Sequence, residues 1–169
     1  MSSKYQIRLA ILRDLQEIVN IYNQAIKAGF KTGHTEPKIP QDMLAWFLEH
    51  NHSKNPVYVA LDDNSVVGWC SLSPYRPGRP ALKQTAEISI FIDFDHLQKG
   101  IGSQLIQYAI TDSQKTGIKV LIAIILEGNE SSLIAFKRNR FEQWGFLPGV
   151  ANFNGVEVGH YFYGFRIDS

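Results

Sequence analysis

The sequence predicts a mixed α/β fold, in which one sheet of about seven strands is flanked by about four helices. A strand pattern at 85–93 leads into a helical pattern at 100–116 and then into the apolar run 120–126. Pairs of short strand patterns lie on both sides of this segment. Strand–helix–strand order favours a parallel pair and hairpins give antiparallel pairs, so together they indicate a mixed sheet. No linker or repeat divides residues 1–169, which are long enough for one domain with a substantial core.

The first 40 residues are expected to form one strand and one helix. Tyr5–Ala10 alternates between apolar and polar residues, as a half-buried strand does. Apolar residues then recur at helical spacing, at Leu15, Ile18, Val19, Tyr22, Ala25 and Ile26. This stripe predicts a helix with one buried face that ends at Gly29. The polar segment 30–40 contains two prolines and is expected to be a loop.

A second helix and a hairpin follow. The helix is predicted over 41–50. Its inward-facing residues are expected to be Leu44, Phe47 and Leu48. Val57–Leu61 and Val66–Ser73 are strand patterns separated by the polar turn Asp62–Ser65, which predicts an antiparallel pair.

The central segment alternates strands and helices. After the strand at 85–93, the helix over 100–116 is expected to end at Gly117. Its buried residues are expected to be Ile101, Leu105, Ile106, Ala109 and Ile110. The continuous apolar run 120–126 is typical of a strand covered on both faces, and a further helix is predicted over 131–139.

The C-terminal segment is predicted to be a hairpin. Phe146–Ala151 and Val156–Ile167 read as strands joined by the turn Asn154–Gly155. The ring-rich stretch His160–Phe165 is interpreted as a packed edge strand, not as a surface on which nucleic-acid bases stack.

The composition argues for a compact cytoplasmic protein that binds neither nucleic acid nor membranes. Seventeen basic and sixteen acidic side chains give no basic excess for nucleic acid. No long apolar run or N-terminal apolar core indicates a membrane span or signal peptide. The single cysteine, Cys70, fits a reducing compartment and is expected to be buried. No metal site is expected, because the histidines form no convincing ligand pair; they are His34, His50, His52, His96 and His160.

The most informative local feature is the glycine-containing turn between the strand at 85–93 and the helix at 100–116. Such a turn presents backbone N–H groups to an anion, and Gly100 and Gly102 allow a phosphate to approach closely. The turn matches neither the P-loop nor the dinucleotide fingerprint. From local chemistry alone, an anion site and an ordinary strand–helix connection both remain open.

Three blocks in order resemble the GNAT acetyltransferase family. Lys99–Gly102, between a strand and a helix, resembles the family's pyrophosphate-binding motif. Asn129–Phe141 resembles its Asn-x-x-Ser-x-x-x-aromatic-x-x-x-Gly-Phe element. Arg76–Glu87 resembles the phosphinothricin and methionine-sulfoximine acetyltransferase branch, in which an arginine-rich loop precedes Thr-x-Glu on the central strand. Ile7–Leu15 and Thr35–Pro37 also fit, so the similarity covers nearly the whole chain.

The resemblance implies a GNAT-like sheet, acetyl-CoA as cofactor, a small-molecule amine as acceptor and a homodimer. It implies contacts to acetyl-CoA from Ile90, Phe91, Ile92, Gln98, Lys99, Gly100, Ile101, Gly102, Ser103, Asn129, Ser132 and Phe136. The backbone of Ile90 and Ile92 would bind the pantetheine arm and polarise the thioester. Asn129 would hold the same arm, cap a helix N-terminus, or do both.

The candidate catalytic residue is Glu87, as general base. Acetyl transfer requires a neutral amine, and a carboxylate on the central strand among Ile88, Ile90 and Phe91 is expected to have a raised pKa. The alternative is an outward-facing strand glutamate without a role.

The resemblance also implies acceptor contacts from Arg76, Arg79 and Glu36. An arginine binds a carboxylate bidentately, which would hold an amino-acid-like acceptor by its acid group and leave its amine free. The related branch uses an arginine at the place of Arg76 in this way. The alternative is that both arginines are solvated or contact a partner subunit.

Three positions depart from the family pattern. Leu97 stands where the family has Arg or Gln, with Gln98 one residue late. Phe136 stands where many members have a tyrosine acid, so a phenyl ring offers no proton to the leaving thiolate. Arg140 replaces a glycine, which costs about 1 kcal/mol if its backbone is left-handed.

The sequence therefore predicts an acetyl-CoA-dependent N-acetyltransferase of a small amino-acid-like substrate, using direct transfer. Two alternatives remain: acetylation of a protein or peptide α-amine, and a noncatalytic acyl-CoA-binding module.

Overall fold

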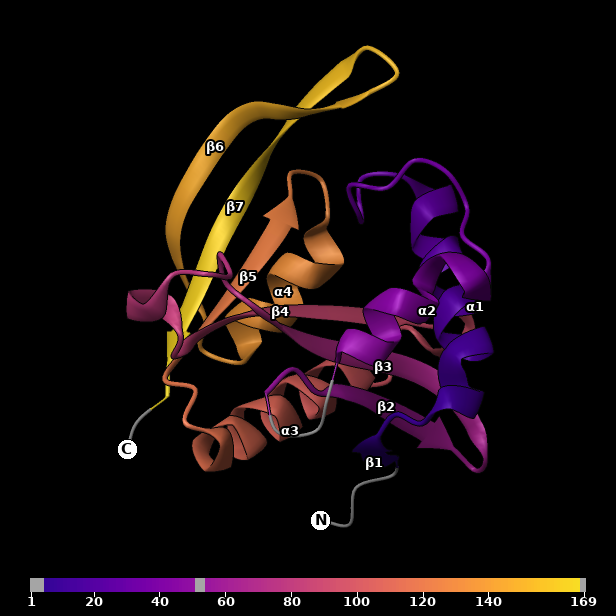
Figure 1. Cartoon of the computed structure of the whole chain (residues 1–169). Helices are drawn as coiled ribbons and strands as arrows, with labels where there is room; N and C mark the ends of the chain where they lie inside the picture. The colour runs from indigo at the N-terminus through magenta and orange to yellow at the C-terminus, as the bar shows by residue number, and fades with distance from the viewer. Residues whose placement is uncertain (1–4, 51–53, 168–169) are drawn as a thin grey trace.

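A single seven-stranded sheet organises the protein, and the computed structural model describes residues 5–50 and 54–167 (Figure 1). In spatial order the strands are β1 (Gln6–Leu9), β2 (Val57–Asp62), β3 (Ser65–Pro74), β4 (Thr85–Ile92), β5 (Val120–Leu126), β7 (Val156–Arg166) and β6 (Glu142–Phe153). The α-helices are α1 (Leu15–Ala28), α2 (Pro40–Glu49), α3 (Ile101–Thr116) and α4 (Glu130–Arg138). The predicted mixed sheet with seven strands and four helices is confirmed.

The sheet splits in its middle. Five neighbouring pairs are antiparallel, and β4 and β5 alone run parallel. Their pairing begins at Thr85 with Val120 and ends after three rungs at Glu87 with Ile122. Beyond that rung β4 stays with β3 and β5 stays with β7, so the two halves diverge (Figure 1).

Two hydrophobic cores cover the two faces of the sheet. One core joins the sheet to α3 and α4, and the other joins it to α1 and α2. Side chains alternate between faces along a strand, so Ala86 and Ile88 of β4 point into the α3 core. Glu87 and Phe91 point to the α1–α2 face, where Phe91 packs against the second core. Cys70 is fully buried, as expected, and burial raises the pKa of its thiol.

Glycines end two helices as the sequence predicts. Gly29 follows α1 with φ 73°, and Gly117 follows α3 with φ 79°. Arg140, which replaces a family glycine, has φ 67° and therefore carries a Cβ in the left-handed region.

The second helix buries a different stripe from the one expected. Leu44 and Leu48 are 37% and 66% exposed, so their predicted inward orientation is wrong. Met43 is buried, while Trp46 and Phe47 pack partly buried against the same core. Because α2 lies at the surface and contacts α1, only this one stripe is covered.

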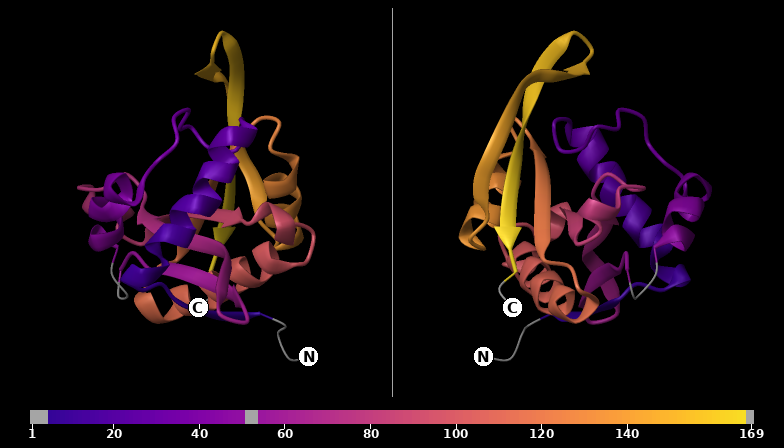
Figure 2. Two further views of the ribbon diagram at one scale, coloured as in Figure 1. Left: turned by 90° about the vertical axis from the view of Figure 1, so that its right-hand side faces the viewer. Right: turned by 60° about the vertical axis from the view of Figure 1, so that its left-hand side comes forward.

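The C-terminal hairpin forms an arm that rises beyond the other elements (Figure 2). Its first strand starts at Glu142, four residues earlier than expected, and ends at Phe153. The expectation that residues 160–165 form an edge strand is wrong, because β7 lies between β5 and β6. The arm also contacts the loop after α1, where the Phe30 and Phe153 rings lie 4.9 Å apart.

Candidate active site

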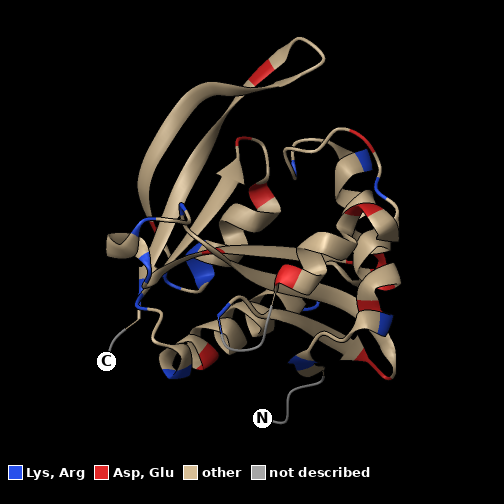
Figure 3. Ribbon diagram, in the orientation of Figure 1, with Lys and Arg blue, Asp and Glu red and all other residues tan. Residues whose placement is uncertain are grey.

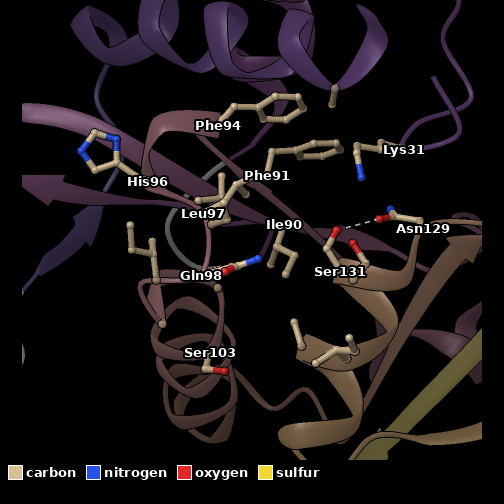
Figure 4. A pocket seen from close by; sticks show the side chains of 18 of the residues that line it. Lys31, Ile90, Phe91, Phe94, His96, Leu97, Gln98, Ser103, Asn129 and Ser131 are labelled. Atoms are coloured by element: carbon tan, nitrogen blue, oxygen red, sulfur yellow. Dashed lines mark hydrogen bonds between the residues drawn. The ribbon is translucent and has the colours of Figure 1, made fainter. Parts of the chain in front are cut away.

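A cavity of about 680 Å³ opens where the two halves of the sheet diverge (Figure 4). Ile90, Phe91 and Ile92 line it from β4. The turn before α3 and its first residues form one side, and α4 with the preceding Asn129 forms another. The cavity therefore lies between β4, α3 and α4, and Ala25 of α1 also lines it.

The N-terminal turn of α3 has a geometry that suits an anion. Gly100 precedes the helix with φ 82°, and a Cβ added there would meet nothing within 4 Å. The first N–H groups of a helix have no intrahelical acceptor, and here Gly100, Ile101, Gly102 and Ser103 line the cavity. A Cβ at Gly102 would lie 3.5 Å from Ile90 Cδ1, so this glycine brings the helix close to β4. The turn therefore has N–H groups that could bind a phosphate group, and β4 and α4 line the same cavity.

The α4 side of the cavity contributes hydrogen-bonding side chains. Asn129 is buried at the N-cap position of α4, but its side chain makes no capping bond. Its Oδ1 accepts a hydrogen bond from Ser131 Oγ at 3.1 Å (Figure 4). Ser131 and Ser132 also line the cavity.

Asn139 ties the two sides of the cavity together. Its Nδ2 donates to Ser103 Oγ at 3.0 Å and to Ala135 O at 2.7 Å. Its Oδ1 accepts from Gln107 Nε2 at 2.8 Å. Since Ser103 and Gln107 belong to α3 and Asn139 ends α4, this buried amide fixes the distance between the helices.

Glu87 lies on the opposite face of β4 from α3, at the last rung before the split. It is three residues before Ile90, about 10 Å along a strand. The side chain is half-buried, and desolvation raises the pKa of its carboxyl above the ordinary value. The carboxyl therefore lies at the split in the sheet but is not among the residues that line the cavity.

The structure gathers most of the sequence-predicted cofactor residues, but not all. Phe136 is 2% exposed and packs in the core against Phe141, so its ring does not line the cavity. Lys99 is exposed and donates from Nζ to Asp95 O. The other ten predicted cofactor residues line the cavity: Ile90, Phe91, Ile92, Gln98, Gly100, Ile101, Gly102, Ser103, Asn129 and Ser132.

The predicted acceptor residues lie on loops. Arg76 and Arg79 are exposed on the loop between β3 and β4, and Arg76 has φ 51°. Glu36 is exposed on the loop between α1 and α2. Among the described residues, none of these three has a hydrogen bond or ion pair to another side chain.

Sequence reasoning missed several cavity residues. Lys31 reaches the cavity from the loop after α1 (Figure 4). Arg138, in the last turn of α4, also lines it. Phe94 and Ser131 also contribute. Lys31 lies in a segment with no periodic pattern, so no sequence signal marks it. The basic end of α4, which includes Arg138, reads from the sequence as a solvated helix end or as a side facing the adenosine phosphates.

Other kinds of site find no support in residues 5–50 and 54–167. No three His, Cys, Asp or Glu side chains there converge as metal ligands. No helix in the same residues is long and apolar enough to cross a bilayer. Acidic and basic residues are interspersed over the elements (Figure 3).

Comparison with known proteins agrees with this geometry. The model for the "Acetyltransferase (GNAT) family" matches residues 15–141. "Putative phosphinothricin acetyltransferase YwnH" of Bacillus subtilis (strain 168) is 43% identical over 150 residues, covering 88% of this chain and 91% of that protein. An "L-methionine sulfoximine/L-methionine sulfone acetyltransferase" of Pseudomonas paraeruginosa is 32% identical over 145 residues, covering 85% and 84%.

A solved structure shares the fold. The structure of a GNAT superfamily phosphinothricin acetyltransferase from Sinorhizobium meliloti, in complex with acetyl-CoA, superposes with a TM-score of 0.91. It is 25% identical and covers 98% of this chain and 89% of its own. The chain therefore belongs to the GNAT acetyltransferase family, whose acetyl donor is acetyl-CoA.

Proposed function

We propose that this enzyme acetylates the amine of a small amino-acid-like substrate by direct transfer from acetyl-CoA, with Glu87 as general base. The observation that carries the proposal is the split of the sheet immediately after Glu87. On one side of the split are the cavity and the turn before α3, whose N–H groups could bind an anion; on the α1–α2 face is the half-buried carboxyl of Glu87. The relatives named for phosphinothricin and methionine sulfoximine support the substrate class.

The residues that would hold the donor are those lining the cavity. The N–H groups of Ile101, Gly102 and Ser103 would bind the pyrophosphate, and Asn129 with the exposed edge of β4 would bind the pantetheine arm. Lys31 and Arg138 add positive charge near the same cavity. When bound, acetyl-CoA supplies an activated acetyl group, whose carbon forms a bond to the amine nitrogen as its bond to sulfur breaks.

The proton balance assigns a role to Glu87. An ammonium group has no free electron pair, so the acceptor must lose one proton before its nitrogen can react. Glu87 accepts this proton, directly or through water, and returns it to solvent. The second proton lost from nitrogen goes to the departing thiolate through water or substrate, since Phe136 is buried and has no acidic proton.

The acceptor's carboxylate would be bound by Arg76. The loop that carries it joins β3 to β4, and Tyr75 N donates to Thr85 O, which fixes the loop two residues from Glu87. Arg79 and Glu36 are weaker candidates for contacts to the same substrate.

The direct test is a thiol-release assay with acetyl-CoA and a panel of amines. Methionine sulfoximine and phosphinothricin should release coenzyme A, whereas an amine without a carboxylate and a peptide α-amine should release little. Preference for the peptide would instead establish the alternative acceptor. Tight acetyl-CoA binding by calorimetry without release for any amine would establish a noncatalytic acyl-CoA-binding module.

We also propose that the protein is a homodimer in the cytoplasm, formed through the hairpin arm. Between Gln143 and Phe165 the arm contains a single Asp, Glu, Lys or Arg residue, Glu157. Its exposed apolar residues are Trp144, Phe146, Leu147, Val150 and Val156. Light scattering at micromolar protein should report twice the chain mass, and replacing Val150 with Asp should give monomers. A parent protein that is monomeric would contradict the dimer.

A further inference from the structure

A second polar group stands beside Glu87 on the α1–α2 face. Ser73 of β3 and Glu87 of β4 are directly opposed in the antiparallel register. Directly opposed side chains project from the same face, with Cβ atoms about 4.5–5.5 Å apart. The Ser73 hydroxyl and the Glu87 carboxyl are therefore neighbours at the rung where pairing with β5 ends.

His50, at the C-terminal end of α2, fixes the direction of this hydroxyl. Its Nδ1 lies 2.7 Å from Trp46 O, and its Nε2 lies 3.1 Å from Ser73 Oγ. A carbonyl oxygen only accepts hydrogen bonds, so Nδ1 carries the proton and donates it. In the neutral ring Nε2 is then an acceptor, and Ser73 Oγ–H donates to it. Burial lowers the pKa of His50, which favours the neutral ring.

We propose that Ser73 binds the acceptor amine together with Glu87, and that His50 is a positioning residue that acts through Ser73. The inference rests on the proposed acetyl transfer. Because its proton points to His50, Ser73 Oγ presents only lone pairs to the amine of the substrate. The Glu87 carboxylate also accepts hydrogen bonds. One ammonium group can therefore donate one N–H to Ser73 and another to Glu87. After Glu87 removes one proton, the bond to Ser73 keeps the nitrogen oriented toward the thioester.

The first test replaces the hydroxyl. Ser73→Ala should lower kcat/KM for the acceptor about ten- to hundredfold, the range for one hydrogen bond to a charged group. Acetyl-CoA affinity by calorimetry should be unchanged, because Ser73 does not line the cavity. Ser73→Thr keeps the hydroxyl and should recover most of the activity. Ser65→Ala is the matched control, since Ser65 is exposed at the other end of the same strand.

The second test concerns His50. His50→Gln retains an oxygen that can accept the Ser73 proton, and should remain close to the parent. His50→Phe has no atom that accepts the Ser73 proton. It should lower kcat/KM for the amine substrate nearly as far as Ser73→Ala does. In the double variant the two losses should not multiply, because His50 acts only through Ser73.

The outcomes separate this inference from the proposed function. If the parent acetylates amino-acid-like amines and folded Ser73→Ala matches it in kcat/KM, the inference is overturned while the function stands. The positioning role is overturned if His50→Phe lowers the melting temperature but leaves the acceptor kinetics unchanged. If the parent acetylates no amine, the proposed function itself fails.

Discussion

Glu87 and Ile122 form the last rung of the parallel pairing between β4 and β5, and the sheet opens immediately beyond them. The position gives the carboxyl two properties at once. It lies at the rung where the two strands separate, and burial raises the pKa of its carboxyl. Under the proposed function, acetyl-CoA would lie in the cavity beyond the split, and the acceptor amine would meet it beside the carboxyl.

Glu87→Gln should keep the fold and the affinity for acetyl-CoA but lose activity. Loss of a general base typically lowers the rate about 10²–10⁴-fold. The parent rate should fall as pH drops through the raised pKa of Glu87, because the protonated carboxyl cannot accept a proton. The variant should lack this limb of the pH–rate profile. Identical profiles for parent and variant would remove Glu87 from the mechanism.

Glu87→Gln should lower activity but raise the stability of the folded protein at neutral pH. Because the folded-state pKa is raised, the carboxyl favours the folded state at low pH, and this contribution is lost as pH rises through the raised pKa. Glu87→Gln removes the buried charge and should raise the melting temperature at pH 7 to 8. The difference should shrink as pH is lowered toward about 4, near the ordinary pKa of a glutamate. A variant that is less stable than the parent at pH 8 would contradict this reasoning.

Gly100 allows the pyrophosphate site to be tested by charge alone. Its φ of 82° is left-handed, a region that Asn and Asp tolerate better than other side chains, and its Cβ direction is open. Gly100→Asp and Gly100→Asn are therefore matched in shape and differ in charge. A negative charge about 6 Å from the phosphates should weaken acetyl-CoA binding roughly 3- to 100-fold relative to the Asn variant. Calorimetry at low and high salt measures this; equal affinities at low salt would place the phosphates elsewhere.

Asn139→Ala should destabilise the protein by about 1–3 kcal/mol, because Ser103 and Gln107 lose a buried partner. The control is Asn20→Ala, since Asn20 is exposed on α1 and bonds only to Gln16 at the surface. That control should change stability by no more than about 0.5 kcal/mol. Urea unfolding measures both variants. Similar losses for the two would mean that Asn139 does not join α3 to α4 energetically.

The elements were predictable from sequence where one periodicity dominates. The strand at 85–93 and the helix at 100–116 have clear patterns of period 2 and 3.6, and both form within a residue of the expected bounds. In α2 two stripes fit helical spacing, one through Leu44 and Leu48 and one through Met43 and Trp46. Only packing against α1 selects the second.

In the candidate site, too, local features were predictable from sequence and features that depend on tertiary contacts were not. The glycine turn is local, so its residues raise the hypothesis of an anion site, but only the resemblance to the GNAT family favours that hypothesis over an ordinary strand–helix connection. The position of β7 between β5 and β6 depends on long-range pairing, which no local pattern encodes. The contact of His50 with Ser73 joins residues 23 positions apart and likewise needs the tertiary fold.

Arg76 provides the last prediction, on the choice of acceptor. The side chain is exposed near the start of β4 and has no ion-pair partner in the described part of the chain, so it is available for a ligand's carboxylate. A guanidinium group binds a carboxylate with two parallel hydrogen bonds. Arg76→Ala should therefore raise KM for methionine sulfoximine about tenfold or more, the effect of losing charge-assisted hydrogen bonds. KM for an amine without a carboxylate should barely change. Lysine keeps the positive charge but lacks the two parallel N–H donors of a guanidinium group. KM of Arg76→Lys for methionine sulfoximine should therefore lie between the values for the parent and for Arg76→Ala. Steady-state kinetics with both acceptors decides the matter: equal effects on the two, or no activity on any carboxylated amine, would refute this substrate class.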